Sequence, residues 1–199
     1  MPDPQLPDHL NEARLDGQTL VQGHFLQVRR DTVRLPDGAQ ATREYVVHPG
    51  AVMIVPLLDD GRVVMERQFR YPVGQVMLEF PAGKIDPGED RLHCAMRELA
   101  EETGYRAAEW ARAAHIHNAV AYSTEAIEIW FARGLTLGEQ RLDDGEFLDV
   151  CSLSVETIDE LAGRGELTDV KTLIGLMWLQ KWRAGNWPLA WQPAPGLPT

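Results

Sequence analysis

Hydrophobic and polar residues follow two different periods along this 199-residue chain. Up to residue 80, short apolar and β-branched runs are separated by Gly, Pro and Asp, a pattern that predicts strands joined by turns. We expect these strands at residues 19–29, 32–35, 41–47, 51–58, 62–68 and 76–80. From Asp90 to Gly104, apolar residues recur at the spacing of one helical face, which predicts a helix. Its apolar residues are Leu92, Ala95, Met96 and Leu99.

The second half of the chain mixes both patterns. Strands are predicted at residues 110–119, 127–132 and 148–153, and helices at residues 155–161 and 169–182. The almost continuously apolar run at residues 51–58 predicts a central strand, with residues 62–68 as its hairpin partner. Mixed strands, with one helix in the middle and helices at the end, favour an α/β sandwich.

Three segments are expected along the chain. Residues 1–48 begin with a polar lead-in, residues 1–16, and continue as a small antiparallel meander with a turn at residues 36–38. Because such a meander has little core of its own, it should bury one face against the rest of the chain or a second subunit. Residues 49–184 form the main domain. Residues 185–199 are rich in Gly, Pro and Trp and are predicted to lack regular structure.

Charge and cysteine usage narrow the classes of partner. The net charge is −11, the pI is near 4.9, and no basic run is long enough to follow a nucleic-acid backbone. RNA and DNA are therefore disfavoured as substrates, whereas a small phosphorylated ligand bound through a metal ion is compatible. The 2 cysteines are too few for a disulfide framework, which indicates reduced thiols and a cytoplasmic protein. The N-terminus does not have the pattern of a leader peptide, and no apolar run approaches roughly 18 residues. Contact with a membrane is therefore not expected.

Three carboxylates crowd one side of the predicted helix. Glu98, Glu101 and Glu102 lie next to one another because residues three and four apart are neighbours on a helix surface. Each like-charge pair costs roughly 0.2 to 0.5 kcal/mol, so a cation is expected to offset the repulsion. A Mg²⁺ ion bound to carboxylates, water and substrate phosphates would do so. A solvated helix face is the alternative interpretation of the three residues. Arg97 is placed to pair with Glu89 or with one of the three carboxylates.

A wider spacing surrounds these residues and is far more specific. It reads Gly83, five residues, Glu89, seven residues, Arg97, Glu98, Leu99, one residue, Glu101, Glu102, one residue and Gly104. This spacing resembles the complete Nudix box. Residues 40–182 resemble in particular the ADP-ribose pyrophosphatase branch of the Nudix hydrolases, through the segments ATREYVVHPGAV, VVMERQFRYPVGQVMLEFPAGKID and ELTDVKTLIGLMWL.

The resemblance implies a Nudix fold, a mixed β-sheet sandwiched between helices, with a small N-terminal antiparallel β-domain that builds a homodimer. It implies hydrolysis of the pyrophosphate bond of ADP-ribose or a similar nucleoside diphosphate sugar, giving AMP and ribose 5-phosphate, with Mg²⁺ or Mn²⁺ as cofactor. Val120 stands where the branch usually has a proline, so the preferred nucleotide stays open. The alternatives are another nucleotide, such as GDP-mannose, NADH or a dinucleoside polyphosphate, and a non-catalytic nucleotide-sensing module.

The resemblance also implies roles for single residues of a metal site. Glu98 and Glu102 are expected to be the principal metal ligands, with Glu101 bridging or binding a further ion. The main-chain carbonyl of Ala82 is the expected additional ligand, and Gly83 allows the close approach of the backbone. Arg97 and Glu89 are expected to orient the ligands within the catalytic set.

The general base and the substrate contacts are expected outside the box. An acidic loop at residues 141–147 is the candidate source of the base: Glu146 aligns best, Asp143 and Asp144 are alternatives, and a solvated loop without a catalytic role is a further interpretation. Four residues are candidates for contacting the substrate: Arg70 at a phosphate, Glu79 at a hydroxyl or metal-bound water, and Arg43 and Glu125.

Overall fold

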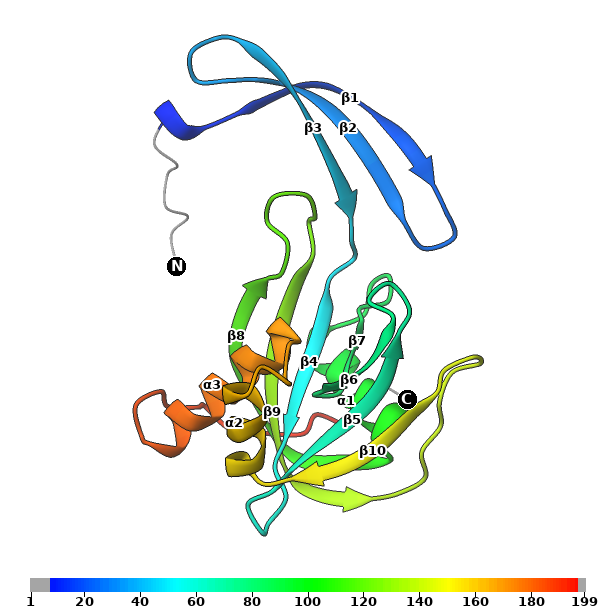
Figure 1. The fold of residues 1–199 in the computed structure, drawn as a ribbon, viewed down its shortest axis with the longest axis vertical. Coiled ribbons are helices and arrows are strands. Elements are labelled where there is room, and N and C mark those ends of the chain that lie inside the picture. The colour runs from blue at the N-terminus through cyan, green and yellow to red at the C-terminus, as the bar shows by residue number, and fades with distance from the viewer. Residues whose placement is uncertain (1–7, 197–199) are drawn as a thin grey trace. The chain divides into compact units, whose positions relative to one another are not determined.

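The computed structural model describes residues 8–196, which form two compact units (Figure 1). The first unit runs to Pro49 and also contains Ala119–Glu125, and the second contains Gly50–Asn118 and the chain from Ala126 onward. The first part of the predicted lead-in, residues 1–7, lies outside the described residues, as do residues 197–199.

The first unit is a three-stranded antiparallel sheet, as predicted. Its strands are β1 (Ala13–Gln22), β2 (Gln27–Arg34) and β3 (Gln40–Val47), in that order, after a 3₁₀ turn at Asp8–Leu10. Two predicted boundaries are wrong. Strand β1 begins inside the expected lead-in, and the strand expected at residues 19–29 is broken by a turn in which the Gly23 N–H donates to the Leu26 carbonyl. Since β1 is exposed along almost its whole length, no alternation of apolar residues marks it in the sequence.

Two sheets make up the second unit. A mixed sheet has the strand order β11, β8, β9, β4 and β7, in which β4 runs parallel to β9 and its other pairs are antiparallel. The bounds of these strands are β4 Ala51–Pro56, β7 Ala82–Lys84, β8 Tyr105–His117, β9 Ala126–Leu137 and β11 Gln192–Pro193. The other sheet is antiparallel and has the order β10 (Leu148–Leu153), β5 (Val63–Arg70) and β6 (Gln75–Glu79).

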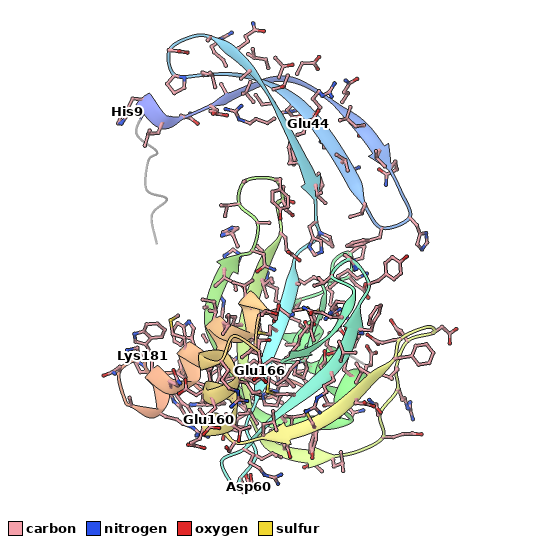
Figure 2. All side chains as sticks on the ribbon, in the orientation of Figure 1. His9, Glu44, Asp60, Glu160, Glu166 and Lys181 are labelled. Carbon is pink, nitrogen blue, oxygen red and sulfur yellow. The ribbon has the colours of Figure 1, made fainter. Side chains whose placement is uncertain are left out.

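Strand β4 separates two apolar cores. Its residues Val52 and Ile54 pack with helix α1 (Arg91–Thr103), whereas Met53 and Val55 face the core that includes helices α2 (Val155–Gly163) and α3 (Val170–Arg183). Because successive strand residues point to opposite faces, a strand covered on both sides must be apolar throughout. Charged residues such as Asp60 are exposed on the surface of this unit (Figure 2). The predicted α/β sandwich is confirmed.

Two other predictions for this unit are wrong. The pattern predicts that residues 62–68 pair with β4, but β5 pairs with β6 and β10, because β9 and β7 occupy the two sides of β4. Among the described residues, an isolated bridge between Leu57 and Val63 corresponds to the predicted hairpin. The tail is predicted to lack regular structure, yet β11 pairs with β8. The Arg133 guanidinium lies 4.1 Å from the centre of the Trp191 ring and helps to hold this pairing.

Helix α1 has the predicted boundaries. The Asp90 side chain caps its N-terminus by accepting hydrogen bonds from the backbone N–H groups of Leu92 and His93. Gly104 ends the helix with a φ of 76°, a conformation that glycine adopts without a steric penalty. The two caps fix the register of the helix and therefore decide which of its side chains face the sheet.

Both cysteines lie in the second unit. Cys94 in α1 and Cys151 in β10 are free thiols, and burial raises the pKa of both. Among residues 8–196, no helix has the length and apolar character needed to cross a membrane.

The close packing of α3 on β4 depends on Gly175. A Cβ at this position would lie 2.7 Å from Met53 Cε and 3.0 Å from the Phe80 ring. We therefore expect Gly175→Ala to lower the free energy of unfolding, measured by chemical denaturation, by about 1–3 kcal/mol through overpacking. The control Gly163→Ala in α2 has open space around the added methyl group and should be neutral or stabilising by about 0.5–1 kcal/mol. Equal effects of the two substitutions would contradict this view of the core.

Candidate active site

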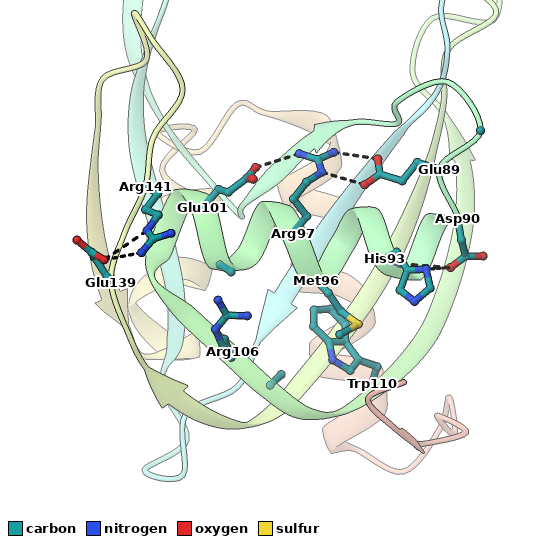
Figure 3. Close-up of a pocket in the computed structure, with 13 residues that line it drawn as sticks. Glu89, Asp90, His93, Met96, Arg97, Glu101, Arg106, Trp110, Glu139 and Arg141 are labelled. Carbon is teal, nitrogen blue, oxygen red and sulfur yellow. Dashed lines mark hydrogen bonds and ion pairs between the residues drawn. The ribbon is translucent and has the colours of Figure 1, made fainter. Parts of the chain in front are cut away.

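Arg97 is the centre of a hydrogen-bonded group on helix α1. Its Nε and Nη2 donate to the two carboxylate oxygens of Glu89 at 2.8 and 2.9 Å, and its Nη1 donates to Glu98 Oε1 at 2.9 Å and Glu101 Oε2 at 3.0 Å. Figure 3 shows the guanidinium between Glu89 and Glu101. The hydrogen bonds from Arg97 lower the pKa of Glu89 to about 2. Arg97 therefore links Glu89, Glu98 and Glu101, and its role in orienting metal ligands remains a prediction.

Gly83 on strand β7 leaves the space that Glu98 occupies. A Cβ added to Gly83 would lie 1.8 Å from the Glu98 carboxylate carbon, so any side chain here would displace that carboxylate. The φ of Gly83 is not positive, so the glycine is needed for this close approach and not for its backbone conformation. The structure thus brings the predicted carboxylate directly against the backbone of the predicted loop.

Glu102 lies beside the same backbone, one helical turn from Glu98. It is 4% exposed, and its Oε2 accepts a hydrogen bond of 3.0 Å from the Ala82 N–H. This contact brings Ala82, Gly83, Glu98 and Glu102 together. The role of the Ala82 carbonyl as a ligand remains a prediction.

Negative charge exceeds positive charge in this region. Burial raises the pKa of Glu98 to about 7, and the charges of Glu101 and Glu146 add to this shift. Burial and the charges of Glu66, Glu98 and Glu146 raise the pKa of Glu102 well above its ordinary value. Glu66 was not expected from the sequence; it is a fully buried residue of β5 whose pKa is raised to about 8 by burial and by Glu79. Its sequence signal is weak, because it directly follows the apolar run Val63–Met65 and is itself followed by the polar residues Arg67 and Gln68.

These residues fit a divalent cation by their chemistry. Both carboxylate oxygens of Glu66 are buried and have no hydrogen-bond partner among residues 8–196. Buried carboxylates that repel one another are stabilised by a hard cation with oxygen ligands, such as Mg²⁺ or Mn²⁺. Within the described part of the chain, however, no three His, Cys, Asp or Glu side chains already converge as a closed ligand set. Binding of a metal therefore requires adjustment of side chains such as Glu98, which Arg97 holds in this structure.

Arg70 and Glu79 are each other's partners. Arg70 Nε and Nη2 donate to the two Glu79 oxygens at 2.7 and 2.9 Å, and Lys171 Nζ also donates to Glu79 Oε2. Burial raises the pKa of Glu79, but the bonds from Arg70 and the charge of Lys171 outweigh burial and lower it. Lys171 also pairs with Asp169, the N-cap of α3, at 3.0 Å. Lys171 was not among the site residues expected from the sequence. The proposed substrate contacts of Arg70 and Glu79 remain predictions.

The acidic loop contributes one carboxylate near this group. Glu146 Oε1 accepts a hydrogen bond of 3.1 Å from Gln68 Nε2 on β5, and the charge of Glu146 raises the pKa of Glu66, Glu98 and Glu102. Asp143 and Asp144 are exposed. Of the three loop candidates, Glu146 is therefore best placed to act as the base, and that role remains a prediction.

The other candidates for substrate contact lie in the first unit. Arg43 Nε donates to Glu12 Oε2 at 2.9 Å, and Glu125 Oε1 lies 3.5 Å from His48 Nε2. Val120, also in this unit, is 81% exposed, and its loop is held to β3 by a hydrogen bond of 2.8 Å from the Val46 N–H to the Tyr122 carbonyl. These observations leave the substrate roles of Arg43 and Glu125 as predictions.

A cavity of about 900 Å³ adjoins helix α1 on the side of strand β8 (Figure 3). Met96 and Trp110 contribute apolar surface to it, and Arg106 contributes charge. Arg97 and Glu101 line the cavity, whereas Glu98 and Glu102 do not. The cavity thus adjoins the carboxylate group without containing its most deeply buried members.

Known proteins match this chain along most of its length. A family model described as the NUDIX domain matches residues 47–173, and one described as the nucleoside diphosphate sugar hydrolase N-terminal domain matches residues 12–46. An ADP-ribose pyrophosphatase of Bacillus subtilis (strain 168) is 32% identical over 173 residues, which cover 86% of this chain and 94% of that protein. A methanol dehydrogenase activator of Bacillus methanolicus is 32% identical over 171 residues, which cover 85% and 92%. The crystal structure of an ADP compounds hydrolase matches this chain with a TM-score of 0.79 at 24% identity, over 88% of this chain and 96% of the hydrolase chain. This match shows a similar fold.

The raised pKa values predict how stability depends on pH. When a chelator removes metal ions, Glu66, Glu98 and Glu102 have raised pKa values in the folded chain. They therefore keep their protons at pH values where the unfolded chain, with ordinary pKa values near 4.5, has lost them. The free energy of unfolding should therefore fall as the pH rises from about 5 to about 8. The lowered pKa of Glu89 acts in the opposite direction, but only below about pH 4.5.

Chemical denaturation at several pH values in the presence of EDTA measures this dependence. Glu66→Gln removes one of the three groups and should make the slope shallower, and added Mg²⁺ should reduce the loss at high pH because it neutralises the carboxylates. A stability that stays constant or rises from pH 5 to 8 would contradict the electrostatics described above.

Proposed function

Because the chain belongs to the Nudix family, we propose that it is a pyrophosphohydrolase that splits ADP-ribose, or a closely similar nucleoside diphosphate sugar, into AMP and ribose 5-phosphate. Members of this family generally need a divalent metal, and we propose Mg²⁺ as the ion used here. The observation that carries the proposal is the group of buried carboxylates around Gly83, which no side-chain cation fully neutralises.

The residues of the box take the following roles in this proposal. Glu98 and Glu102 would hold the metal together with the Ala82 carbonyl, and Glu101 would contribute to the same ion or to a further one. When bound, the metal neutralises phosphate oxygens and lowers the pKa of a coordinated water. Arg97 positions Glu98 and Glu101, and Glu89 fixes the guanidinium through its two hydrogen bonds.

Glu146 is the proposed general base of the reaction. It accepts a proton from the water that attacks one phosphorus atom, while the bond from that phosphorus to the bridging oxygen breaks. The bridging oxygen leaves with the other phosphate, so one water is consumed and two phosphomonoesters form. Gln68 orients Glu146 through its hydrogen bond, which prevents the loop carboxylate from turning into solvent.

Four residues are the proposed contacts of the substrate. They are Arg70, Glu79, Arg43 and Glu125. Arg70 reaches a phosphate by exchanging one of its hydrogen bonds to Glu79, and Lys171 keeps Glu79 neutralised while it does so.

We also propose that the protein is a cytoplasmic homodimer formed through its first unit. Apolar side chains of this small sheet and its first turn are 39 to 51% exposed: Leu15, Leu20, Val21, Phe25 and Leu26. Burying these side chains against a second copy would supply the core that a three-stranded sheet does not have by itself. The two free thiols support the proposed cytoplasmic location, because thiols stay reduced in that compartment.

A second candidate function is hydrolysis of another nucleotide within the same family. Two relatives with 32% identity carry different names, one a pyrophosphatase and one an activator of a dehydrogenase, so identity at this level does not select the substrate. Residues outside the box, such as exposed Val120, are candidates for setting this choice. A sensor without catalysis is disfavoured, because binding alone does not require the complete set of clustered carboxylates.

A panel of substrates tests the proposed specificity. The purified protein with Mg²⁺ should release AMP from ADP-ribose with a higher kcat/KM than it hydrolyses GDP-mannose, NADH or a diadenosine polyphosphate, measured by chromatography of the products. If ADP-ribose were among the slower substrates, the proposed branch would be wrong while the family assignment stood.

Glu102→Gln tests the metal site. We expect kcat to fall about 100-fold or more, because a ligand that stabilises the transition state is lost, while far-ultraviolet circular dichroism stays the same. The control Glu160→Gln changes an exposed glutamate of α2 and should retain full activity. Equal activity of the two variants would overturn the role of Glu102.

A further inference from the structure

Glu66 is a buried carboxylate without a partner. It lies in strand β5 between Met65 and Arg67, and its exposed fraction is 0%. Neither carboxylate oxygen has a hydrogen-bond partner among residues 8–196. Burying an unpartnered carboxyl group costs several kcal/mol or more, so native proteins nearly always satisfy such groups. The position therefore calls for an interaction that protein side chains do not provide.

The neighbours of Glu66 cannot supply a cation. Its partner across the ladder is Glu79, and like charges directly opposite each other repel. The two cationic groups nearby, Arg70 and Lys171, are both bonded to Glu79. These side chains leave Glu66 with an excess of negative charge around it.

Another buried glutamate of this unit shows the ordinary solution. Glu128 on strand β9 is 6% exposed, and its Oε1 pairs with Arg112 Nη2 at 2.9 Å and with Arg91 Nε at 3.6 Å. Its carboxylate is thus compensated by side chains of the chain itself. Among residues 8–196, Glu66 has no such arginine partner.

The strand geometry directs Glu66 toward those ligands. Residues two apart on a strand share a face, and Gln68 on the face of Glu66 bonds Glu146 at 3.1 Å. The ladder partner of Glu66, Glu79, lies three residues before Ala82, whose N–H donates to Glu102 Oε2 at 3.0 Å. Strand β5 and helix α1 thus contribute Glu66 and Glu102 to the same part of the second unit.

We propose that Glu66 is a further ligand of the divalent metal, which it shares with Glu98 and Glu102. This inference rests on the proposed function, because it assigns one more residue to the same site. A cation with several oxygen ligands satisfies the carboxylate that the protein leaves unpartnered, and strand β5 fixes its position more firmly than a loop would.

Binding of Mn²⁺ alone, followed by electron paramagnetic resonance, tests the proposal without any measurement of activity. Glu66→Gln keeps the shape of the side chain and removes its charge, and it should weaken Mn²⁺ binding about 10- to 100-fold. The matched control Glu128→Gln alters a buried glutamate that has its own arginine partners and should bind Mn²⁺ like the unmodified protein. Glu66→Met, with an apolar side chain of similar length, repeats the measurement if the Gln variant does not fold.

The possible results separate this proposal from the function on which it rests. Weaker binding in the Glu66 variants, with normal binding in Glu128→Gln, supports the proposal, and a smaller rise in thermal midpoint on addition of Mn²⁺ should accompany it. Normal binding in Glu66→Gln together with weak binding in Glu98→Gln overturns the role of Glu66 and leaves the metal site intact. Equal weakening in Glu128→Gln also overturns it. Absence of Mn²⁺ binding to the unmodified protein overturns the proposed function itself.

Discussion

Repulsion among carboxylates buried beside helix α1 is the constraint on which the rest of the structure depends. Arg97 serves Glu89, Glu98 and Glu101 at once, so its single charge cannot neutralise the group. Burial raises the pKa of Glu66, Glu98 and Glu102, which measures how unfavourable their charged forms are without further compensation. Folding such a site without a cation costs free energy, because the buried carboxylates repel one another. The site is suited to a divalent cation that also binds a diphosphate.

The scaffold holds these charges together through rigid elements. Strand β4, buried on both faces, anchors β7 on one side, and β7 brings Gly83 against Glu98. The caps at Asp90 and Gly104 set the rotation of α1 and so direct Glu98 and Glu102 toward β7. On the other sheet, Arg70, Lys171 and Glu79 form a compensated cluster next to uncompensated Glu66. Compensated and uncompensated carboxylates thus lie side by side within this Nudix fold.

Local sequence signals were sufficient where a single segment carries the information. Helix α1, the strand at residues 148–153 and the Gly38 turn follow from period, capping and turn chemistry within a few residues. The prediction fails where pairing partners are distant. Strand β5 joins β6 and β10 instead of β4, β1 is exposed and carries no alternation, and β11 forms because Trp191 and Arg133 meet across the chain. Such pairings depend on which strand edges remain open after the core has formed.

The sequence by itself determined the family, the acidic helix and the identity of the carboxylates within the box, because their spacing lies within one loop and one helix. Tertiary structure alone decided that the charge of Glu66 on strand β5 acts on Glu102 and that the charge of Glu146 on a distant loop acts on Glu98 and Glu102. It also decided that Arg70 is already paired with Glu79. The physical reason is that charge interactions act through space. Residues 66 and 102 have no pattern in common along the chain, and only folding brings their charges within range of each other.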